Sequence, residues 1–193
     1  MSGSISLVIP ALNEAPSIGA VLASLPQGVF DEVLVVDNGS TDGTALVAAA
    51  HGATVIDEPA RGYGRACLAG IARRSPHCEI VVFMDADASD DPTDVSQIVD
   101  PIRLGQADLV IGARRGARVQ AGSLAPHQRW GNRLATFLIR RLYGAPCSDL
   151  GPFRAIRKDA LTSLDMREPT FGWTVEMQAK ALRRGLRVVE QPV

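Results

Sequence analysis

The 193-residue sequence is poor in cysteine and in aromatic residues, and each shortage excludes a class of protein. The three cysteines, Cys67, Cys78 and Cys147, are spaced like neither a zinc site nor a disulfide framework. We therefore expect free thiols in a reducing compartment. Aromatic residues make up 5% of the chain, too few to stack bases along a groove, so we expect no nucleic-acid partner.

A long apolar run is also missing. The longest weakly charged stretch, residues 15–30, is broken by Pro16 and Pro26 and falls short of the ~20 apolar residues that span a bilayer. The N-terminus has no basic region, so no signal peptide is predicted. With 46% apolar and 21% charged residues, the chain has the composition of one globular domain. We expect a soluble, cytoplasmic protein.

Lysine is scarce as well, because 18 of the 20 basic residues are arginine and only Lys158 and Lys180 are lysine. The formal net charge of -1 hides a division along the chain. Residues 1–100 carry 14 acidic and 4 basic groups, whereas residues 101–193 carry 7 acidic and 16 basic groups. Planar guanidinium groups suit bidentate contacts with phosphate or carboxylate, although codon bias gives the same arginine excess.

Short apolar runs rich in valine and isoleucine recur along the chain, and each is followed by a polar turn and a helical pattern. Apolar runs without alternation are typical of strands covered on both faces. The sequence therefore predicts an α/β fold with a mostly parallel, Rossmann-like sheet and helices on both faces. The predicted strands are residues 5–9, 32–37, 54–56, 80–84 and 109–111, and the predicted helices are residues 17–25, 43–50, 65–73, 92–104 and 128–142.

A glycine- and proline-rich stretch, residues 144–152, interrupts this alternation of apolar runs and helical patterns. An apolar segment at 153–156, a helix near 174–184 and a strand at 187–193 follow it. This part is too short to be a second domain. We interpret it as the completing edge of the same sheet, with loops that cover a site.

The most specific local signal is an apolar run that ends in Asp85 and Asp87. Two carboxylates at the tip of a buried strand repel each other, and a divalent cation such as Mg²⁺ or Mn²⁺, completed by substrate phosphates, offsets the repulsion. Asp90 and Asp91 are interpreted as caps of the next helix. An EF-hand is excluded, because its glycine position holds Asp90 and its final glutamate position holds Ser96. A phosphatase nucleophile is disfavoured, because that motif normally ends the first strand.

Polar residues follow two earlier strands. Glu14, next to Asn13, can accept both hydroxyls of a ribose or can cap the helix that follows. Asp37 ends the second run and can accept a hydrogen bond from a base edge. Thr41 and Asp42 are interpreted as helix caps. In open α/β sheets ligands bind where the strands reach their carboxyl ends, and these residues fall there.

A glycine pair, Gly62 and Gly64, opens a predicted helix and lets the backbone approach a ligand closely. The pair is not a dinucleotide fingerprint, because the third glycine position holds Cys67, and the chain has no P-loop.

Five ordered motifs carry a resemblance to a known family. They are VIPALNE at 8–14, VDNGSTD at 36–42, GYG at 62–64, DAD at 85–87 and GAR at 112–114. Together they resemble the family 2 glycosyltransferases of the GT-A fold, and within these the dolichyl-phosphate and polyprenyl-phosphate sugar synthases. The resemblance covers nearly the whole chain. It implies a GDP- or UDP-sugar donor, a lipid phosphate acceptor and contact with the inner face of the cell membrane.

The resemblance also implies roles for single residues within one domain, residues 1–193. Residues 1–115 are the nucleotide- and metal-binding part and residues 116–193 the acceptor-side part. Asp85 and Asp87 are the implied metal ligands, and Arg114 and Arg129 the implied phosphate ligands of the acceptor. The implied nucleotide-binding residues are Pro10, Ala11, Asn13, Glu14, Asp37, Gly62, Gly64, Asp85 and Ala86, and the implied acceptor-side residues are Arg114, Arg129, Asp149 and Arg154.

The sequence departs from the family's pattern in three places. Ser89 stands where many of these synthases have a metal-contacting glutamine, and Arg65 stands where many have lysine. The chain stops at Val193, where relatives usually continue with a basic juxtamembrane segment, so we expect a C-terminal extension to be lacking.

The acceptor decides which further groups the reaction needs. A lipid phosphate is already ionised at neutral pH, because its second pKa is near ~6, and needs only positioning by arginines. Arg129, Arg133 and Arg140 share one helix face, which is also compatible with a solvated surface or membrane contact. A hydroxyl acceptor needs a carboxylate base. Glu176 is the candidate base, and it can equally cap the helix that it opens.

Three hypotheses follow. The first is an inverting, metal-dependent transfer of mannose or glucose to polyprenyl phosphate, with Asp87, Arg114 and Arg129 as the catalytic groups. The second is a family 2 glycosyltransferase with a hydroxyl acceptor, as in cell-wall or polysaccharide synthesis, in which Glu176 is also catalytic. The third is a nucleotide-sugar-binding module without turnover.

Overall fold

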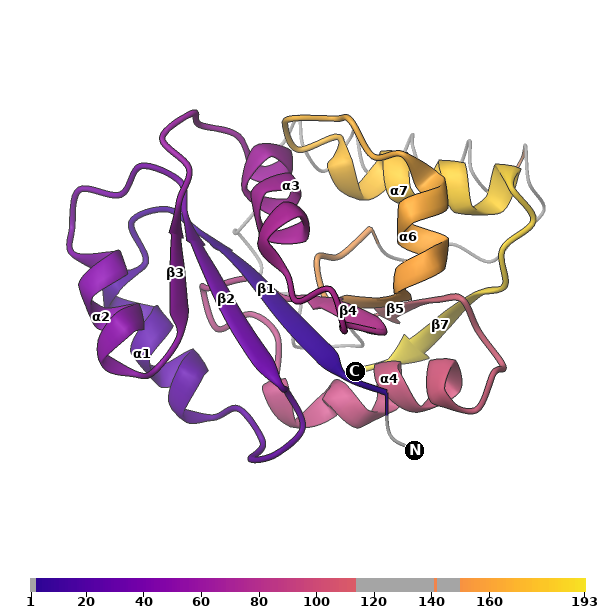
Figure 1. Ribbon diagram of the computed structural model, residues 1–193, viewed down its shortest axis with the longest axis horizontal. Coiled ribbons are helices and arrows are strands. Elements are labelled where there is room, and N and C mark those ends of the chain that lie inside the picture. Colours follow the sequence, from indigo (N-terminus) through magenta and orange to yellow (C-terminus); the bar gives the residue numbers. More distant parts are fainter. Residues whose placement is uncertain (1–2, 114–140, 142–149) are drawn as a thin grey trace.

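The computed structural model describes residues 3–113, 141 and 150–193, which form a seven-stranded sheet flanked by helices (Figure 1). The strands are β1 (Ile5–Ala11), β2 (Glu32–Asp37), β3 (Thr54–Asp57), β4 (Ile80–Phe83), β5 (Leu109–Ala113), β6 (Arg154–Arg157) and β7 (Val188–Pro192). The helices are α1 (Ala15–Ala23), α2 (Thr44–Ala50), α3 (Tyr63–Arg73), α4 (Val95–Arg103), α6 (Lys158–Leu164) and α7 (Trp173–Arg183), with a 3-10 turn η1 (Pro92–Asp94) before α4.

The strands lie in the order β3-β2-β1-β4-β6-β5-β7. All of them run in one direction except β6, which is antiparallel to both β4 and β5. The central strand β1 pairs with β2, so that Ala11 lies opposite Asp37, and with β4, so that Val8 lies opposite Phe83. Strands β1 to β4 therefore end on the same side of the sheet, which we call its carboxyl end.

Helices cover both faces of the sheet. Ile5, Leu7 and Ile9 of β1 point to the face that α1, α2 and α4 cover, and Val8 points to the face that α3, α6 and α7 cover. Figure 1 shows the last three helices grouped on one side of the strands. Every residue of β1 and β4 is buried, as expected for parallel strands between two helical layers.

The structure confirms the α/β fold, the mostly parallel sheet and the helices on both faces. The predicted strands and the helices up to residue 104 are present, with ends displaced by at most two residues, except that the first turn of 92–104 is the 3-10 turn η1. The predicted helix 128–142 lies outside the described residues, apart from Arg141. Within the described ranges no helix is both long enough and apolar enough to cross a membrane.

The prediction that residues after 152 complete the edge of the sheet is wrong for the first of these strands. β6 lies in the interior, between β4 and β5, and only β7 lies at the edge. The physical reason is the burial of Ala155 and Ile156, which are 0% exposed and need neighbours on both sides. The short helix α6, which follows the last residue of β6 directly, was not predicted from the sequence.

A buried carboxylate connects the three C-terminal strands at the end of the sheet opposite the carboxyl end. Asp108 lies just before β5 and accepts hydrogen bonds from Arg187 Nε at 3.0 Å and Nη2 at 2.9 Å. Arg157, the last residue of β6, places its Nη2 3.1 Å from the same carboxylate. The hydrogen bonds from Arg187 lower the pKa of Asp108 to about 2, although burial opposes the shift.

Replacing this carboxylate tests its contribution to stability. We expect Asp108→Asn to reduce the free energy of unfolding at pH 7 by about 2 kcal/mol, since each pKa unit corresponds to about 1.4 kcal/mol. The folded-state pKa lies below the unfolded value of about 3.9, so this stabilisation is present above about pH 5. It is lost as the pH falls through about 2. Urea unfolding at several pH values measures the difference between wild type and variant.

Asp100 supplies the matched control, because it is exposed and lies 3.6 Å from Arg103 in a single ion pair within α4. Asp100→Asn should change the free energy of unfolding by about 0.5 kcal/mol or less. Equal losses in the two variants would contradict the role of Asp108.

Candidate functional site

Two loops at the carboxyl end of the sheet are joined by Asn13. Its backbone is left-handed, with φ 57°, a conformation that asparagine tolerates better than most residues. The Asn13 N–H donates to Ser40 Oγ at 2.9 Å, and Asn13 Oδ1 accepts from the Thr41 N–H at 2.9 Å. The side-chain oxygen of this predicted nucleotide-binding residue therefore fastens the β1–α1 loop to the β2–α2 loop.

Asp42 caps two helices, as its predicted capping role requires. Its Oδ1 accepts from the Thr44 N–H at 3.0 Å and from Thr44 Oγ1 at 2.6 Å, at the start of α2. Its Oδ2 accepts from the Ala15 N–H at 3.1 Å, at the start of α1. The hydrogen bond from Thr44 lowers the pKa of Asp42. Thr41, also predicted to cap, instead donates to Asn13.

The two carboxylates predicted to bind a nucleoside lie on these same loops. Glu14 opens α1 and accepts a hydrogen bond from Ser17 Oγ at 2.6 Å through Oε2. Asp37 ends β2 and accepts from the Ser40 N–H at 3.0 Å through Oδ1. Each of these bonds uses one oxygen of its carboxylate. Both side chains are half-buried, so they combine a fixed position with access to the surface.

The end of β1 lies beside them. Pro10 and Ala11 are buried, and Ala11 lies opposite Asp37 in the pairing of β1 with β2. The Asn38 N–H donates to the Ala11 carbonyl at 2.9 Å and continues this pairing beyond the strand. The structure therefore brings together Pro10, Ala11, Glu14 and Asp37.

Asn38 is a positioning residue that the sequence interpretation missed. It is 4% exposed, and its Nδ2 donates to the carbonyls of Glu58 and Ala60, both at 2.9 Å. Its Oδ1 accepts from the Gly62 N–H at 2.7 Å. Asn38 therefore holds the connection between β3 and α3 against the end of β2. The sequence indicated only a turn here, because Asn-Gly is a turn dipeptide.

The glycine pair at the start of α3 has a partner within the chain. A Cβ on Gly62 would overlap the carbonyl oxygen of Pro169, and one on Gly64 would overlap that of Glu168. The Gly64 N–H donates to the Thr170 carbonyl at 3.2 Å, and the Arg65 N–H to the Pro169 carbonyl at 3.0 Å. Residues 165–172, which we call the α6–α7 loop, therefore pack closely against the backbone of this glycine pair.

The paired aspartates follow β4 at the carboxyl end of the sheet. Asp85 is half-buried, Ala86 is buried, and Asp87 is exposed and accepts from the Ser89 N–H at 2.9 Å through Oδ1. No described cluster of three or more histidine, cysteine, aspartate or glutamate side chains is placed to enclose a metal. Two carboxylates open to the surface fit Mg²⁺ or Mn²⁺ that shares its remaining positions with substrate phosphates. Asp85 and Asp87 do not form a site in which the protein alone supplies all the metal ligands.

Aromatic side chains connect this region to the α6–α7 loop. Burial raises the pKa of Cys67 in α3, and the Asp85 carboxylate raises it further. Tyr63 stacks on Phe171 with ring centroids 6.3 Å apart, and it meets Trp173 edge-on at 6.2 Å. The α6–α7 loop therefore lies beside the start of α3, at the carboxyl end of the sheet.

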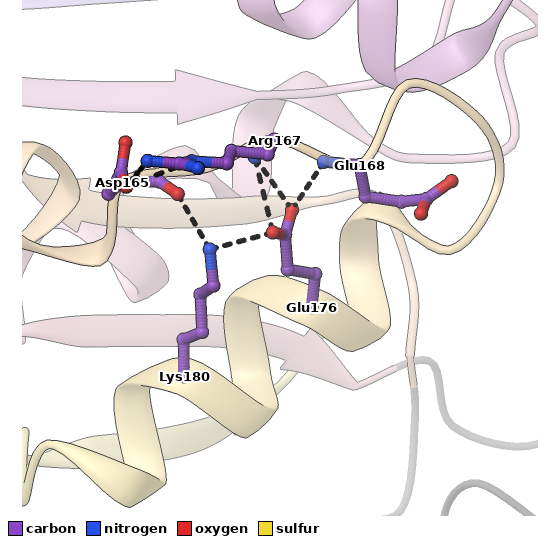
Figure 2. Close-up of polar contacts among 5 residues, drawn as sticks. All are labelled: Asp165, Arg167, Glu168, Glu176 and Lys180. Atoms are coloured by element: carbon purple, nitrogen blue, oxygen red, sulfur yellow. Dashed lines mark hydrogen bonds and ion pairs between the residues drawn. The ribbon is translucent and has the colours of Figure 1, made fainter.

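Glu176 in α7 holds the α6–α7 loop in place (Figure 2). Its carboxylate accepts from the Arg167 N–H at 3.1 Å and from the Glu168 N–H at 2.8 Å, and it lies 2.7 Å from Lys180 Nζ. Burial alone would raise the pKa of Glu176, but the hydrogen bonds from Lys180 and from the two backbone N–H groups outweigh it and lower the pKa. Glu176 does not cap α7, whose N-cap is Gly172 without a side-chain hydrogen bond, and its carboxylate instead binds the backbone of the α6–α7 loop.

Arg154, predicted on the acceptor side, is 0% exposed. Its guanidinium donates to the carbonyls of Leu150, Gly151 and Thr174, so it fastens the entry to β6 against α7. These contacts describe a residue that positions backbone within the core. The other predicted acceptor-side residues, Arg114, Arg129 and Asp149, lie outside the described residues.

Comparison with known proteins shows which family this chain resembles. The sequence model of the family Glycosyl transferase family 2 matches residues 6–164. An uncharacterised glycosyltransferase of Mycobacterium tuberculosis is 41% identical over 194 residues, which cover 98% of this chain and 84% of that protein. The undecaprenyl-phosphate mannosyltransferase of Micrococcus luteus is 31% identical over 201 residues, which cover 96% of this chain and 81% of that protein.

The fold of this chain is also similar to that of solved structures. The glucosyl-3-phosphoglycerate synthase of Mycobacterium tuberculosis in complex with phosphoglyceric acid is similar, with a TM-score of 0.81 and 31% identity over 98% of this chain and 69% of that one. Its complex with Mn²⁺, UDP-glucose and phosphoglyceric acid has a TM-score of 0.79 and 31% identity, covering 98% of this chain and 70% of that one.

Gly64 tests the packing of the α6–α7 loop. We expect Gly64→Ala to reduce the free energy of unfolding by about 1–3 kcal/mol, because the new methyl group overlaps the Glu168 carbonyl and backbone must move. Gly19→Ala in α1 is the control, since its methyl group meets only the side chains of His51 and Val47. Thermal unfolding of both variants measures the difference. A stable Gly64→Ala variant would show that the loop is free to shift.

Proposed function

This chain belongs to the family 2 glycosyltransferases, and we propose that it transfers a hexose from a GDP- or UDP-sugar to a polyprenyl phosphate. The observation that carries this proposal is the meeting of Glu14, Asp37 and the Asp85–Asp87 pair at the carboxyl end of β1, β2 and β4. A nucleotide-diphospho-sugar has hydroxyl groups and a base edge for the first two carboxylates. Its diphosphate provides the charge that complements a metal held by the aspartates.

The donor binds, in this proposal, along the ends of β1 and β2. Glu14 accepts hydrogen bonds from the ribose hydroxyls, and Asp37 accepts one from the base. Both carboxylates are oriented by a hydrogen bond to one oxygen, from Ser17 and Ser40, which leaves the other oxygen for a ligand. The remaining donor-side residues complete the walls, in line with the proposed donor part at 1–115. They are Pro10, Ala11, Asn13, Gly62, Gly64 and Ala86.

Asp85 and Asp87 would hold Mg²⁺ or Mn²⁺. The similar synthase structure that contains Mn²⁺ and UDP-glucose supports this assignment. When bound, the ion supplies Lewis-acid stabilisation of the diphosphate that leaves the sugar. The half-buried position of Asp85 and the hydrogen bond from the Ser89 N–H to Asp87 keep both carboxylates oriented before the donor arrives.

A phosphate acceptor suits the groups around the α6–α7 loop. Glu176 engages two backbone N–H groups and Lys180, and its lowered pKa makes it a weak proton acceptor. A lipid phosphate needs no base, because it is ionised at neutral pH. We place it in the acceptor part, residues 116–193, with Arg114, Arg129 and Asp149 as its proposed contacts. The name of the Micrococcus luteus relative supports such an acceptor.

A hydroxyl acceptor is the second candidate. It is favoured by the similarity to the synthase crystallised with phosphoglyceric acid, a small acceptor of a different kind. Transfer to a lipid requires contact with a membrane, at its inner face in this proposal, whereas transfer to phosphoglycerate does not. The two candidates therefore differ in where the enzyme works.

Asp87 tests the metal and donor assignment. We expect Asp87→Asn to lower hexose transfer at least about hundredfold, because metal stabilisation of a leaving group is worth several kcal/mol. The Mn²⁺-dependent rise in melting temperature with GDP- or UDP-sugars should disappear in the same variant. Asp100→Asn on α4 should leave both readouts unchanged. Full activity of Asp87→Asn in the presence of chelator would refute the assignment.

The acceptor is tested by offering labelled donor with polyprenyl phosphate or with 3-phosphoglycerate. We expect product with the lipid phosphate and inversion at the anomeric carbon. Glu176→Gln and Lys180→Gln should each lower the rate by about tenfold or less without changing the pH profile, since both loosen the same loop. The opposite outcome is transfer to a hydroxyl with a loss of about a thousandfold in Glu176→Gln alone, which would identify Glu176 as a base.

A further inference from the structure

The connection between β3 and α3, residues 58–62, has few contacts that hold it in place. None of its residues is buried, because Glu58 and Gly62 at its two ends are half-buried and the residues between them are exposed. Within the connection, the Ala60 N–H donates to Glu58 Oε1 at 3.0 Å. Among the described residues outside it, Asn38 is the one whose side chain forms hydrogen bonds with the connection. Its position therefore depends on Asn38 rather than on burial.

The amide of Asn38 matches the backbone of this connection. Nδ2 carries two hydrogens, and it donates to the carbonyls of Glu58 and Ala60, both at 2.9 Å. Oδ1 accepts from the Gly62 N–H at 2.7 Å. Among side chains of this size, only an amide supplies two donors and an acceptor from one planar group. Because Asn38 is buried, a backbone group that loses its bond to the amide is left without a partner, which is costly.

The same residue is fixed at the end of β2, next to the proposed base ligand Asp37. The Asn38 N–H donates to the Ala11 carbonyl at 2.9 Å, and the Glu58 N–H donates to the Asp37 carbonyl at 2.9 Å. No other hydrogen bond between described residues joins positions 59–62 to the end of β2. Asn38 therefore sets the distance between Asp37 and Gly62, which is a proposed wall of the donor site.

We propose that Asn38 is a positioning residue for the donor, whose amide keeps the β3–α3 connection beside Asp37 and thereby sets the affinity for the nucleotide without touching it. This inference rests on the donor site of the proposed function. The three bonds of the amide exist before the nucleotide arrives, so binding does not have to order the connection. Loss of the amide should therefore weaken donor binding and leave the chemical step at the diphosphate unchanged.

Calorimetric titration of the full chain with UDP and with GDP, in the presence of Mn²⁺, tests this role. We expect Asn38→Ala to weaken binding of the nucleotide that wild type prefers by at least about tenfold. Asn38→Asp keeps the volume and an acceptor for the Gly62 N–H, but its carboxylate faces two carbonyls without a donor, so it should lose at least as much. In transfer assays the KM for the donor should rise by the same factor, while kcat changes by less than about twofold.

Asp108→Asn is the matched control, because it removes a buried hydrogen-bonding group at the opposite end of the sheet. A merely destabilising change lowers the amount of folded enzyme, and thus the apparent kcat, at an unchanged KM. Asn38→Ser replaces Asn38→Ala if the latter does not fold. Unchanged affinity in the Asn38 variants, or a loss confined to kcat as in the control, would overturn this inference alone. Binding of neither nucleotide by wild type would instead refute the proposed donor, and this inference with it.

Discussion

Parallel pairing of β1 with both β2 and β4 is the constraint on which the rest of this site depends. It makes three strands end side by side, and it places Asp37 opposite Ala11 and brings Asp85 to the same end. Parallel strands need crossover helices, and here each crossover begins with a loop at that end. The polar residues of the site are therefore gathered by topology, although 74 residues separate Ala11 from Asp85 along the chain.

Most polar side chains at this end satisfy backbone groups that the strand ends leave without partners. Asn38 serves three of them, and Asp42 serves the first residues of two helices. An unsatisfied buried backbone group costs about 1–3 kcal/mol, so the loops keep one geometry. The residues of the site therefore have two different roles. Asn13 and Asn38 hold the loops in position, whereas Glu14 and Asp37 each keep one carboxylate oxygen for a ligand.

The sequence was informative where the deciding interaction is local. Asp85 and Asp87 could be placed at a strand end because the apolar run before them is a strand in itself, and Asp42 could be recognised as a cap from its neighbours. The packing of the α6–α7 loop against Gly64 could not be predicted, since Glu168 lies 104 residues further along the chain. The position of β6 in the sheet could not be predicted either, because its four residues do not indicate which two strands will lie beside them. The roles of Arg114 and Arg129 remain predictions.

Arg154 shows how the charge division of the sequence is used within the fold. It comes from the basic half, but it is buried among backbone carbonyls rather than exposed to an acceptor. Burial raises the pKa of Tyr63 most, the negative charge of Asp85 raises it further, and the positive charge of Arg154 lowers it. A buried guanidinium is costly unless it is bonded and balanced. Arg154 obtains its bonds from the start of α7 and the entry to β6. The basic half thus contributes a cation that holds backbone in place within the core.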